Sequence, residues 1–182
     1  MIEVRFHGRG GQGAVTSAEL VAHAAISEGK YAQSFPSFGP ERRGAPVQSF
    51  TRVSDRPIRL RTAIREPDFS VVLDPSLILV GGSLAGLKKD GMVIINTRKS
   101  VAEIKKEFSI AARTAVVDAT KIALEVLNLP ITNTTMIGAL VKASGVVDMD
   151  SLIEPLRHRF GRIADKNITV CRRAYEATVI EE

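Results

Sequence analysis

The chain has 182 residues, 45% of them hydrophobic and 25% charged, which fits one globular domain over residues 1–182 and leaves little room for a second. No apolar run approaches the ~20 residues of a membrane span, and the N-terminus leads directly into alternating apolar and polar residues rather than an apolar signal segment, so we expect a soluble, cytoplasmic protein. The single Cys171 excludes an internal disulfide and an iron–sulfur cluster held by thiolates of this chain. The net charge of +5 lies in residues 1–65, which hold ten basic and five acidic side chains, and an aromatic content of only 5% argues against a nucleic-acid partner.

Strand and helix patterns alternate along the chain. Apolar runs bounded by Gly, Pro or Asp predict strands, and apolar residues at helical spacing predict helices. The predicted strands are residues 2–7, 31–35, 47–53, 70–74, 92–96 and 115–119, and the predicted helices are residues 14–28, 101–108, 120–127, 134–144, 151–160 and 167–180. This order predicts a three-layer α/β/α fold with a mostly parallel, Rossmann-like sheet. The sheet is mixed if residues 47–53 and 58–62 pair as an inserted antiparallel hairpin.

A glycine-rich segment lies between the first predicted strand and the first predicted helix. It fits the pattern G-x-G-x-x-G in the context where that pattern binds phosphate groups, because glycine permits a tight turn and the helix N-terminus offers free N–H groups. A cation within the segment would strengthen anion binding. The alternative is that the glycines only let the strand and helix pack closely. The candidate site residues here are Gly8, Arg9, Gly10, Gly11, Gln12 and Gly13.

A dinucleotide site would also need an acidic residue roughly 20 positions beyond this segment to bind a ribose hydroxyl. The second predicted strand, which begins at Tyr31, has no acidic residue. The next arginines lie well past the end of that strand, so an NADP phosphate would also lack a nearby partner. NAD and NADP are therefore poor candidates.

Residues 34–47 form a second unusual segment, which contains three prolines and two glycines. The prolines fix a defined loop, and its two phenylalanines must pack on something or be covered by a partner. One acid and two arginines in succession suit a carboxylate, a phosphate or an interface ion pair. The plain alternative is a rigid surface loop with a local salt bridge. The candidate residues are Ser37, Glu41, Arg42 and Arg43.

Four stretches of the chain together resemble a known family. They are GRGGQG at residues 8–13, AQSFPSFGPERRGAPVQSF at residues 32–50, REPD at residues 65–68 leading into VVLD at residues 71–74, and residues 133–145 with IGAL and KASG. This combination, which spans nearly the whole chain, resembles the gamma subunits of 2-oxoacid:ferredoxin oxidoreductases, and the pyruvate synthase branch in particular.

The resemblance implies a division of labour in a heterotetramer that converts pyruvate and coenzyme A to acetyl-CoA, CO2 and reduced ferredoxin. The alpha and beta subunits of such a complex bind thiamine diphosphate with magnesium, and the beta and delta subunits hold iron–sulfur clusters. We expect this chain to hold none of these groups, to be inactive alone, and to have the alpha, beta and delta subunits as partners. Its two candidate segments would face the coenzyme A entry path or only the partner subunits, and the sequence leaves both open.

Two other functions remain open from the sequence. The glycine pattern admits a stand-alone NAD(P)-binding oxidoreductase, and the lack of a clustered acid, base and nucleophile admits a purely structural scaffold. Asp74 and Asp118 stand at predicted strand ends, where ligands bind in open α/β sheets, but we expect each to cap the following helix. The three histidines show no spacing typical of a metal site.

Overall fold

A single mixed sheet forms the centre of the computed structural model, which describes residues 1–37, 44–80 and 82–181. Within this part, seven strands are ordered β2-β3-β1-β4-β5-β6-β7. Strands β1, β4, β5 and β6 run parallel, whereas β3 is antiparallel to both β1 and β2, and β7 is antiparallel to β6. The strands are β1 (Ile2–Arg9), β2 (Tyr31–Pro36), β3 (Pro46–Ser54), β4 (Phe69–Val72), β5 (Met92–Asn96), β6 (Arg113–Val117) and β7 (Val179–Glu181).

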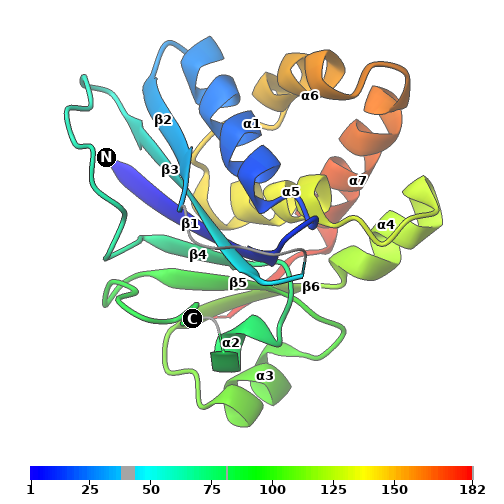
Figure 1. Ribbon diagram of the computed structural model, residues 1–182. Helices are drawn as coiled ribbons and strands as arrows, with labels where there is room; N and C mark the ends of the chain where they lie inside the picture. Colours follow the sequence, from blue (N-terminus) through cyan, green and yellow to red (C-terminus); the bar gives the residue numbers. More distant parts are fainter. Residues whose placement is uncertain (38–43, 81, 182) are drawn as a thin grey trace.

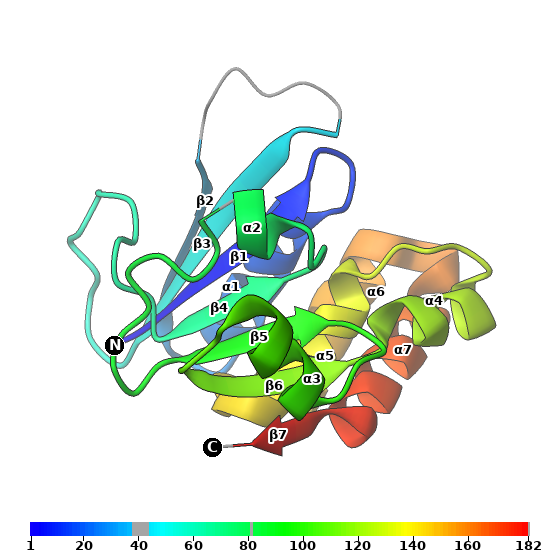
Figure 2. The same ribbon diagram turned by 90° about the horizontal axis from the view of Figure 1, so that it is seen from below.

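Helices cover the sheet on both faces, as Figures 1 and 2 show from two directions. On one face, α1, α5, α6 and α7 enclose the main core, whereas the short α2 and α3 lie on the other face over β4, β5 and β6. The helices are α1 (Ala14–Ser27), α2 (Leu77–Val80), α3 (Val101–Phe108), α4 (Ala119–Leu127), α5 (Asn133–Ser144), α6 (Ile153–Phe160) and α7 (Ala164–Ala177), with 3-10 turns η1 (Asp150–Leu152) and η2 (Gly161–Ile163). The predicted three-layer α/β/α fold with a mixed sheet is confirmed.

The central strands are buried on both faces, which explains their continuous apolar sequence. All five residues of β5 are buried, and alternate ones serve different cores: Ile94 lies in the core that includes α5, whereas Val93 and Ile95 lie in the core that includes α3. Among the described residues, no helix is long and apolar enough to cross a membrane.

Two predicted elements are wrong. Residues 58–62 do not pair with β3, whose partners are β1 and β2; they lie in an irregular segment instead. The last helix does not run through residues 167–180: α7 starts earlier, at Ala164, and ends at Ala177, after which Val179 and Ile180 pair with β6. Smaller differences affect residues 73–74 and 118–119, which lie beyond the ends of β4 and β6, and the start of the helix predicted at residue 151, which is a 3-10 turn.

Candidate functional site: the glycine turn and its neighbours

The glycine segment begins inside β1 and ends at the start of α1. Gly8 and Arg9 are the last residues of β1, and Gly13 is the N-cap of α1. Gly13 has a left-handed φ of 83°, and a Cβ there would lie 2.6 Å from Nδ2 of Asn133 at the start of α5. A side chain at this position would thus be strained and would also push α5 away from α1. The close-packing explanation for the glycines therefore holds at Gly13.

The side chain of Gln12 folds back into the turn. Its Oε1 accepts a hydrogen bond from the backbone N–H of Arg9 at 2.6 Å, and its own backbone N–H donates to the Arg9 carbonyl at 2.9 Å. Its Nε2 reaches Oδ2 of Asp74 at 3.4 Å. The backbone donor of Arg9, which a bound phosphate could have used, is therefore already satisfied by the chain itself.

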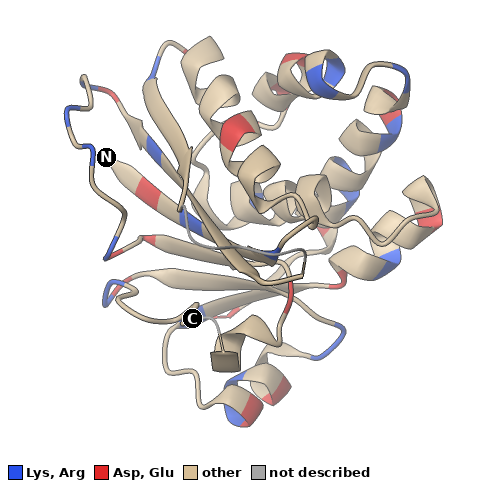
Figure 3. Ribbon diagram, in the orientation of Figure 1, with Lys and Arg blue, Asp and Glu red and all other residues tan. Residues whose placement is uncertain are grey.

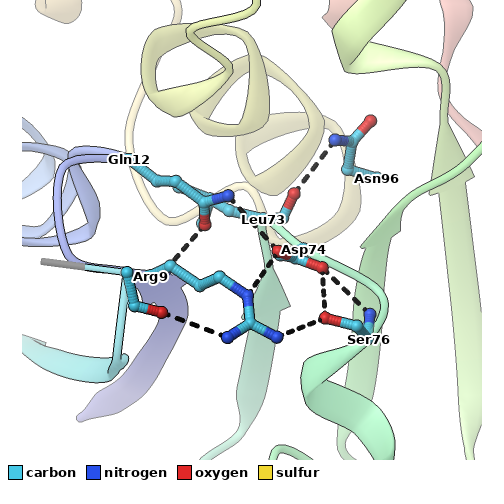
Figure 4. A network of polar contacts seen from close by, with 7 residues as sticks. Arg9, Gln12, Leu73, Asp74, Ser76 and Asn96 are labelled. Atoms are coloured by element: carbon cyan, nitrogen blue, oxygen red, sulfur yellow. Dashed lines mark hydrogen bonds and ion pairs between the residues drawn. The ribbon is translucent and has the colours of Figure 1, made fainter.

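Arg9 lies in a network of internal partners, shown in Figure 4. Its Nε donates to Oδ2 of Asp74 at 2.9 Å, its Nη2 donates to Oγ of Ser76 at 2.8 Å, and its Nη1 donates to the carbonyl of Gly44 at 3.1 Å. The Arg9 side chain is thus held by partners within the chain and is not free to bind a phosphate in this arrangement. Its guanidinium instead fixes β1, the residues after β4 and the loop end at Gly44 relative to one another.

Asp74 is the acceptor at the centre of this network. Partial burial acts to raise its pKa, but hydrogen bonds from the Ser76 hydroxyl and backbone N–H, and from Arg9 and Gln12, outweigh burial, so the pKa lies below the usual value. Because the Ser76 N–H bonds to Oδ1 of Asp74 at 3.0 Å, this aspartate closes the turn that leads into α2. The predicted helix cap at Asp74 is therefore wrong: its side chain closes the turn before α2 and joins that turn to the glycine segment.

The structure brings the two candidate segments together. The Gly10 N–H donates to the Ala45 carbonyl at 2.9 Å, and the Gly44 N–H donates to the Gly10 carbonyl at 3.3 Å. On the other side of the loop, the Ser37 N–H donates to the Gln48 carbonyl at 2.9 Å. The predicted residues Glu41, Arg42 and Arg43 lie outside the described residues. The end of their loop at Gly44 is hydrogen-bonded to the glycine turn, and the end at Ser37 is hydrogen-bonded to β3.

The sheet topology argues against a dinucleotide site of the usual kind. In such a site the strand that follows the glycine turn and its helix lies beside the first strand, so that its end can hold the ribose. Here β2 is separated from β1 by the antiparallel β3. The edge at which a ribose would bind is therefore occupied by a different strand, in agreement with the missing acidic residue.

A hollow that the sequence did not single out lies at the ends of β5 and β6. It has a volume of about 640 Å³ and its lining includes Asn96, Arg98, Asp118, Thr120 and Lys121. Asn96 joins the strand ends, since its Nδ2 donates to the Leu73 carbonyl at 3.0 Å (Figure 4) and also to Oγ1 of Thr120 at 2.9 Å. The one sequence signal for this hollow was the place of these residues just after parallel strands.

The same strand ends show which role Asp118 has. Its Oδ1 accepts from the Lys121 N–H at 2.9 Å, so it is the N-cap of α4, as predicted.

The cysteine and the histidine of β1 are buried. Burial raises the pKa of the Cys171 thiol to about 12, and burial together with the nearby Arg5 guanidinium lowers the pKa of His7 to about 3. Neither is an exposed nucleophile or base near neutral pH. Among residues 1–37, 44–80 and 82–181, no group of three or more His, Cys, Asp or Glu side chains could hold a metal ion.

Comparison with known proteins identifies the family. The chain is 55% identical over 184 aligned residues, covering 100% of both chains, to the Pyruvate/ketoisovalerate oxidoreductases common subunit gamma of Thermococcus litoralis. It is 52% identical, over 97% of both chains, to the Pyruvate synthase subunit PorC of Methanothermobacter marburgensis. The crystal structure of pyruvate oxidoreductase subunit PORC from Thermotoga maritima superposes with a TM-score of 0.89 at 36% identity, covering 100% of this chain and 98% of that one. Residues 3–177 match the family model described as pyruvate ferredoxin/flavodoxin oxidoreductase, and the chain belongs to this family.

Proposed function

We propose that this chain is the gamma subunit of a pyruvate:ferredoxin oxidoreductase, in which it is needed for assembly and has no redox chemistry of its own. The observation that carries the proposal is the end-to-end similarity to subunits named gamma or PorC. The geometry agrees, because Arg9 and Gln12 in the glycine turn are used in internal hydrogen bonds and Cys171 is buried. A stand-alone NAD(P)-dependent enzyme is disfavoured by the place of β3 between β1 and β2.

In the proposed complex, the partner subunits hold thiamine diphosphate, magnesium and the iron–sulfur clusters, and ferredoxin accepts the electrons. The whole of residues 1–182 acts as one gamma-type domain, in the cytoplasm. A single cysteine supports this division, because a cluster usually needs four thiolate ligands. Because one relative is named as a subunit common to pyruvate and ketoisovalerate oxidoreductases, we also propose that this chain serves both kinds of complex and that the catalytic subunits choose the 2-oxoacid.

Reconstitution tests the assembly role. The alpha, beta and delta subunits from the same organism are purified with and without this chain, and pyruvate- and coenzyme A-dependent reduction of ferredoxin is measured. We expect no activity from the chain alone, little from the three other subunits, and recovery when it is added. Activity of the isolated chain, or failure to bind the other subunits, would contradict the proposal. Repeating the addition with ketoisovalerate-specific subunits tests whether the chain is shared.

We further propose that the glycine turn and the adjoining arginine loop form the part of the subunit that faces coenzyme A or a partner subunit. The support is the hydrogen bonding of Gly10 to both Gly44 and Ala45, together with the basic charge of residues 1–65. The double substitution of Arg42→Ala and Arg43→Ala separates the two roles. In the assembled complex, a higher KM for coenzyme A indicates ligand contact, whereas weaker assembly with an unchanged KM indicates an interface. Wild-type values for both would remove this loop from the site.

A further inference from the structure

One face of the sheet carries aromatic and charged side chains away from the helices. In β3, the hydroxyls of Ser49 and Thr51 donate to backbone carbonyls of α1 at 2.7 and 2.9 Å, so both point towards that helix. Because side chains alternate along a strand, Phe50 and Arg52 point to the opposite face. Of the described helices, only α1 packs extensively against β2 and β3.

An irregular segment runs past this face instead. We call residues 55–66 the arginine strap; in Figure 3 several of its positions are coloured as basic. The strap is tied to the edge strand, because Nε2 of Gln33 in β2 donates to the carbonyl of Ile58 at 3.1 Å. Its Leu60 side chain is 48% exposed.

A hollow of about 630 Å³ lies between the strap and the sheet. The rings of Phe35 and Phe50, which are tilted by 32° with centroids 5.1 Å apart, line it from the sheet, whereas Arg61 and Ala63 line it from the strap. Phe50 is only 2% exposed, so the half-buried Phe35 forms most of the accessible aromatic wall, and an open hollow with such a wall is suited to an apolar side chain of a partner.

The strap has more basic than acidic side chains, and its arginines lack acidic partners among the described residues. Its two acids are Asp55 and Glu66, and its exposed arginines are Arg56, Arg59, Arg61 and Arg65. In the part of the chain that the structure describes, no carboxylate lies within 4.0 Å of any of these four guanidinium groups.

Several arginines elsewhere on the described chain are paired with carboxylates, although Arg98 and Arg162 also have none within 4.0 Å. The exposed Arg157 contacts Glu154 at 2.9 Å, Arg172 contacts Asp150 at 3.0 Å, and the buried Arg52 contacts Glu3 at 2.8 Å. The strap also has arginine at every basic position and no lysine. Arginine is enriched at protein interfaces, whereas lysine is depleted there, so a surface that only needs solvation does not explain this choice well.

We propose that the arginine strap and the aromatic hollow beneath it form the docking surface for an acidic face of another subunit of the complex. The inference rests on the proposed function, since it presupposes a multi-subunit assembly. Charge complementarity selects an acidic partner, and the hollow accepts an apolar side chain from the centre of the partner's surface. The arginines are spread over ten residues of irregular chain, up to ~30 Å when extended, which suits a protein surface better than one small anion.

Charge reversal of the strap tests the proposal in the co-expressed complex. The variant combines Arg59→Glu and Arg61→Glu, and its matched control combines Arg162→Glu and Lys166→Glu, which makes the same charge change at exposed positions near the start of α7. The Kd of each chain for the other subunits is measured at increasing NaCl concentrations. For the strap variant we expect a Kd higher by roughly tenfold or more and a weaker salt dependence, and for the control wild-type behaviour.

A second measurement needs no substitution. Hydrogen exchange of residues 55–66 is compared between the free chain and the complex, and protection in the complex is the expected result. Wild-type Kd and salt dependence in the strap variant, or no added protection, would overturn the inference. So would normal assembly of that variant with a raised KM for coenzyme A, because the arginines would then bind a phosphate-bearing ligand. If the wild-type chain does not bind the other subunits at all, the proposed function fails as well, which distinguishes the two failures.

Discussion

The buried histidine of β1 makes the stability of the fold sensitive to mild acid. His7 is 1% exposed and accepts a hydrogen bond at its Nε2 from Nε of Arg5 at 2.9 Å. Its pKa is lowered from 6.5 to about 3 by burial and by the positive charge of Arg5. The unfolded chain would protonate this imidazole near pH 6.5, whereas the folded chain would keep it neutral down to about pH 3.

The sign and size of the effect follow from this difference. Between these two pH values the unfolded state binds one more proton, so acidification favours unfolding. At ~1.4 kcal/mol per pH unit, lowering the pH from 6.5 to about 5 should remove roughly 2 kcal/mol of unfolding free energy through His7 alone. Above pH 6.5 the dependence due to His7 should fade, and it should be nearly absent at about pH 7.5. The carboxylates with lowered pKa, such as Asp74, act only at more acidic pH.

Urea unfolding at several pH values between about 7.5 and 5 measures this loss. In His7→Gln, whose amide oxygen can still accept from Arg5, the loss should be smaller than in the wild type by roughly 2 kcal/mol. The matched control is His23→Gln at an exposed position of α1, which should keep the wild-type pH dependence. Equal pH slopes in all three proteins would refute the reasoning. Should His7→Gln not fold, an NMR titration of the wild-type imidazole decides instead, because protonation above pH 5 would contradict the lowered pKa.

Three further predictions concern stability. In Gly138→Ala the new Cβ would lie 1.9 Å from the Cys171 carbonyl oxygen, so α5 and α7 must separate. We expect urea unfolding to show a net loss of about 2 kcal/mol of unfolding free energy. The control Thr169→Ala, at an exposed position of α7, should lose less than about 0.5 kcal/mol. Asp118→Ala removes the cap of α4 and should cost about 1 kcal/mol, whereas Asp118→Asn should cost little, as thermal unfolding can show. The buried Cys171 should react with a thiol reagent only as fast as the chain unfolds, and rapid labelling of the native protein would contradict its burial.

The sequence predicted local structure well where the determining signals are local. The helix at residues 101–108 was predicted within its observed bounds, because Ser100 and Glu103 form a capping box at its start. The prediction failed where the partner is distant in sequence. Residues 179–181 continue a helical pattern but pair with β6, more than 60 positions earlier. Residues 58–62 alternate like a strand, yet β1 and β2 already occupy both edges of β3.

In the candidate site, too, the local features could be predicted and the contacts between distant residues could not. The turn glycines and the neighbouring loop could be singled out from local composition, and the structure brings Gly10 next to Gly44. No local pattern, however, could show that Arg9 meets Asp74, which lies 65 positions away and accepts its guanidinium Nε. The sequence could therefore mark an arginine beside a glycine turn, but not whether its charge was free for a ligand.

The distinction between neutralised and free arginines separates two kinds of surface on this chain. Arg9 and Arg52 hold the fold together, because each is paired with a carboxylate from a different strand or loop. The arginines of the strap have no such partner among the described residues. A partner that covers them must offset the cost of their desolvation, which an acidic surface does by pairing with their charges. If the strap is the docking surface proposed above, the subunit keeps one docking surface whatever 2-oxoacid its partners use. It could thus be shared between complexes only if those complexes present the same acidic face, so a ketoisovalerate-specific partner lacking that face should not bind.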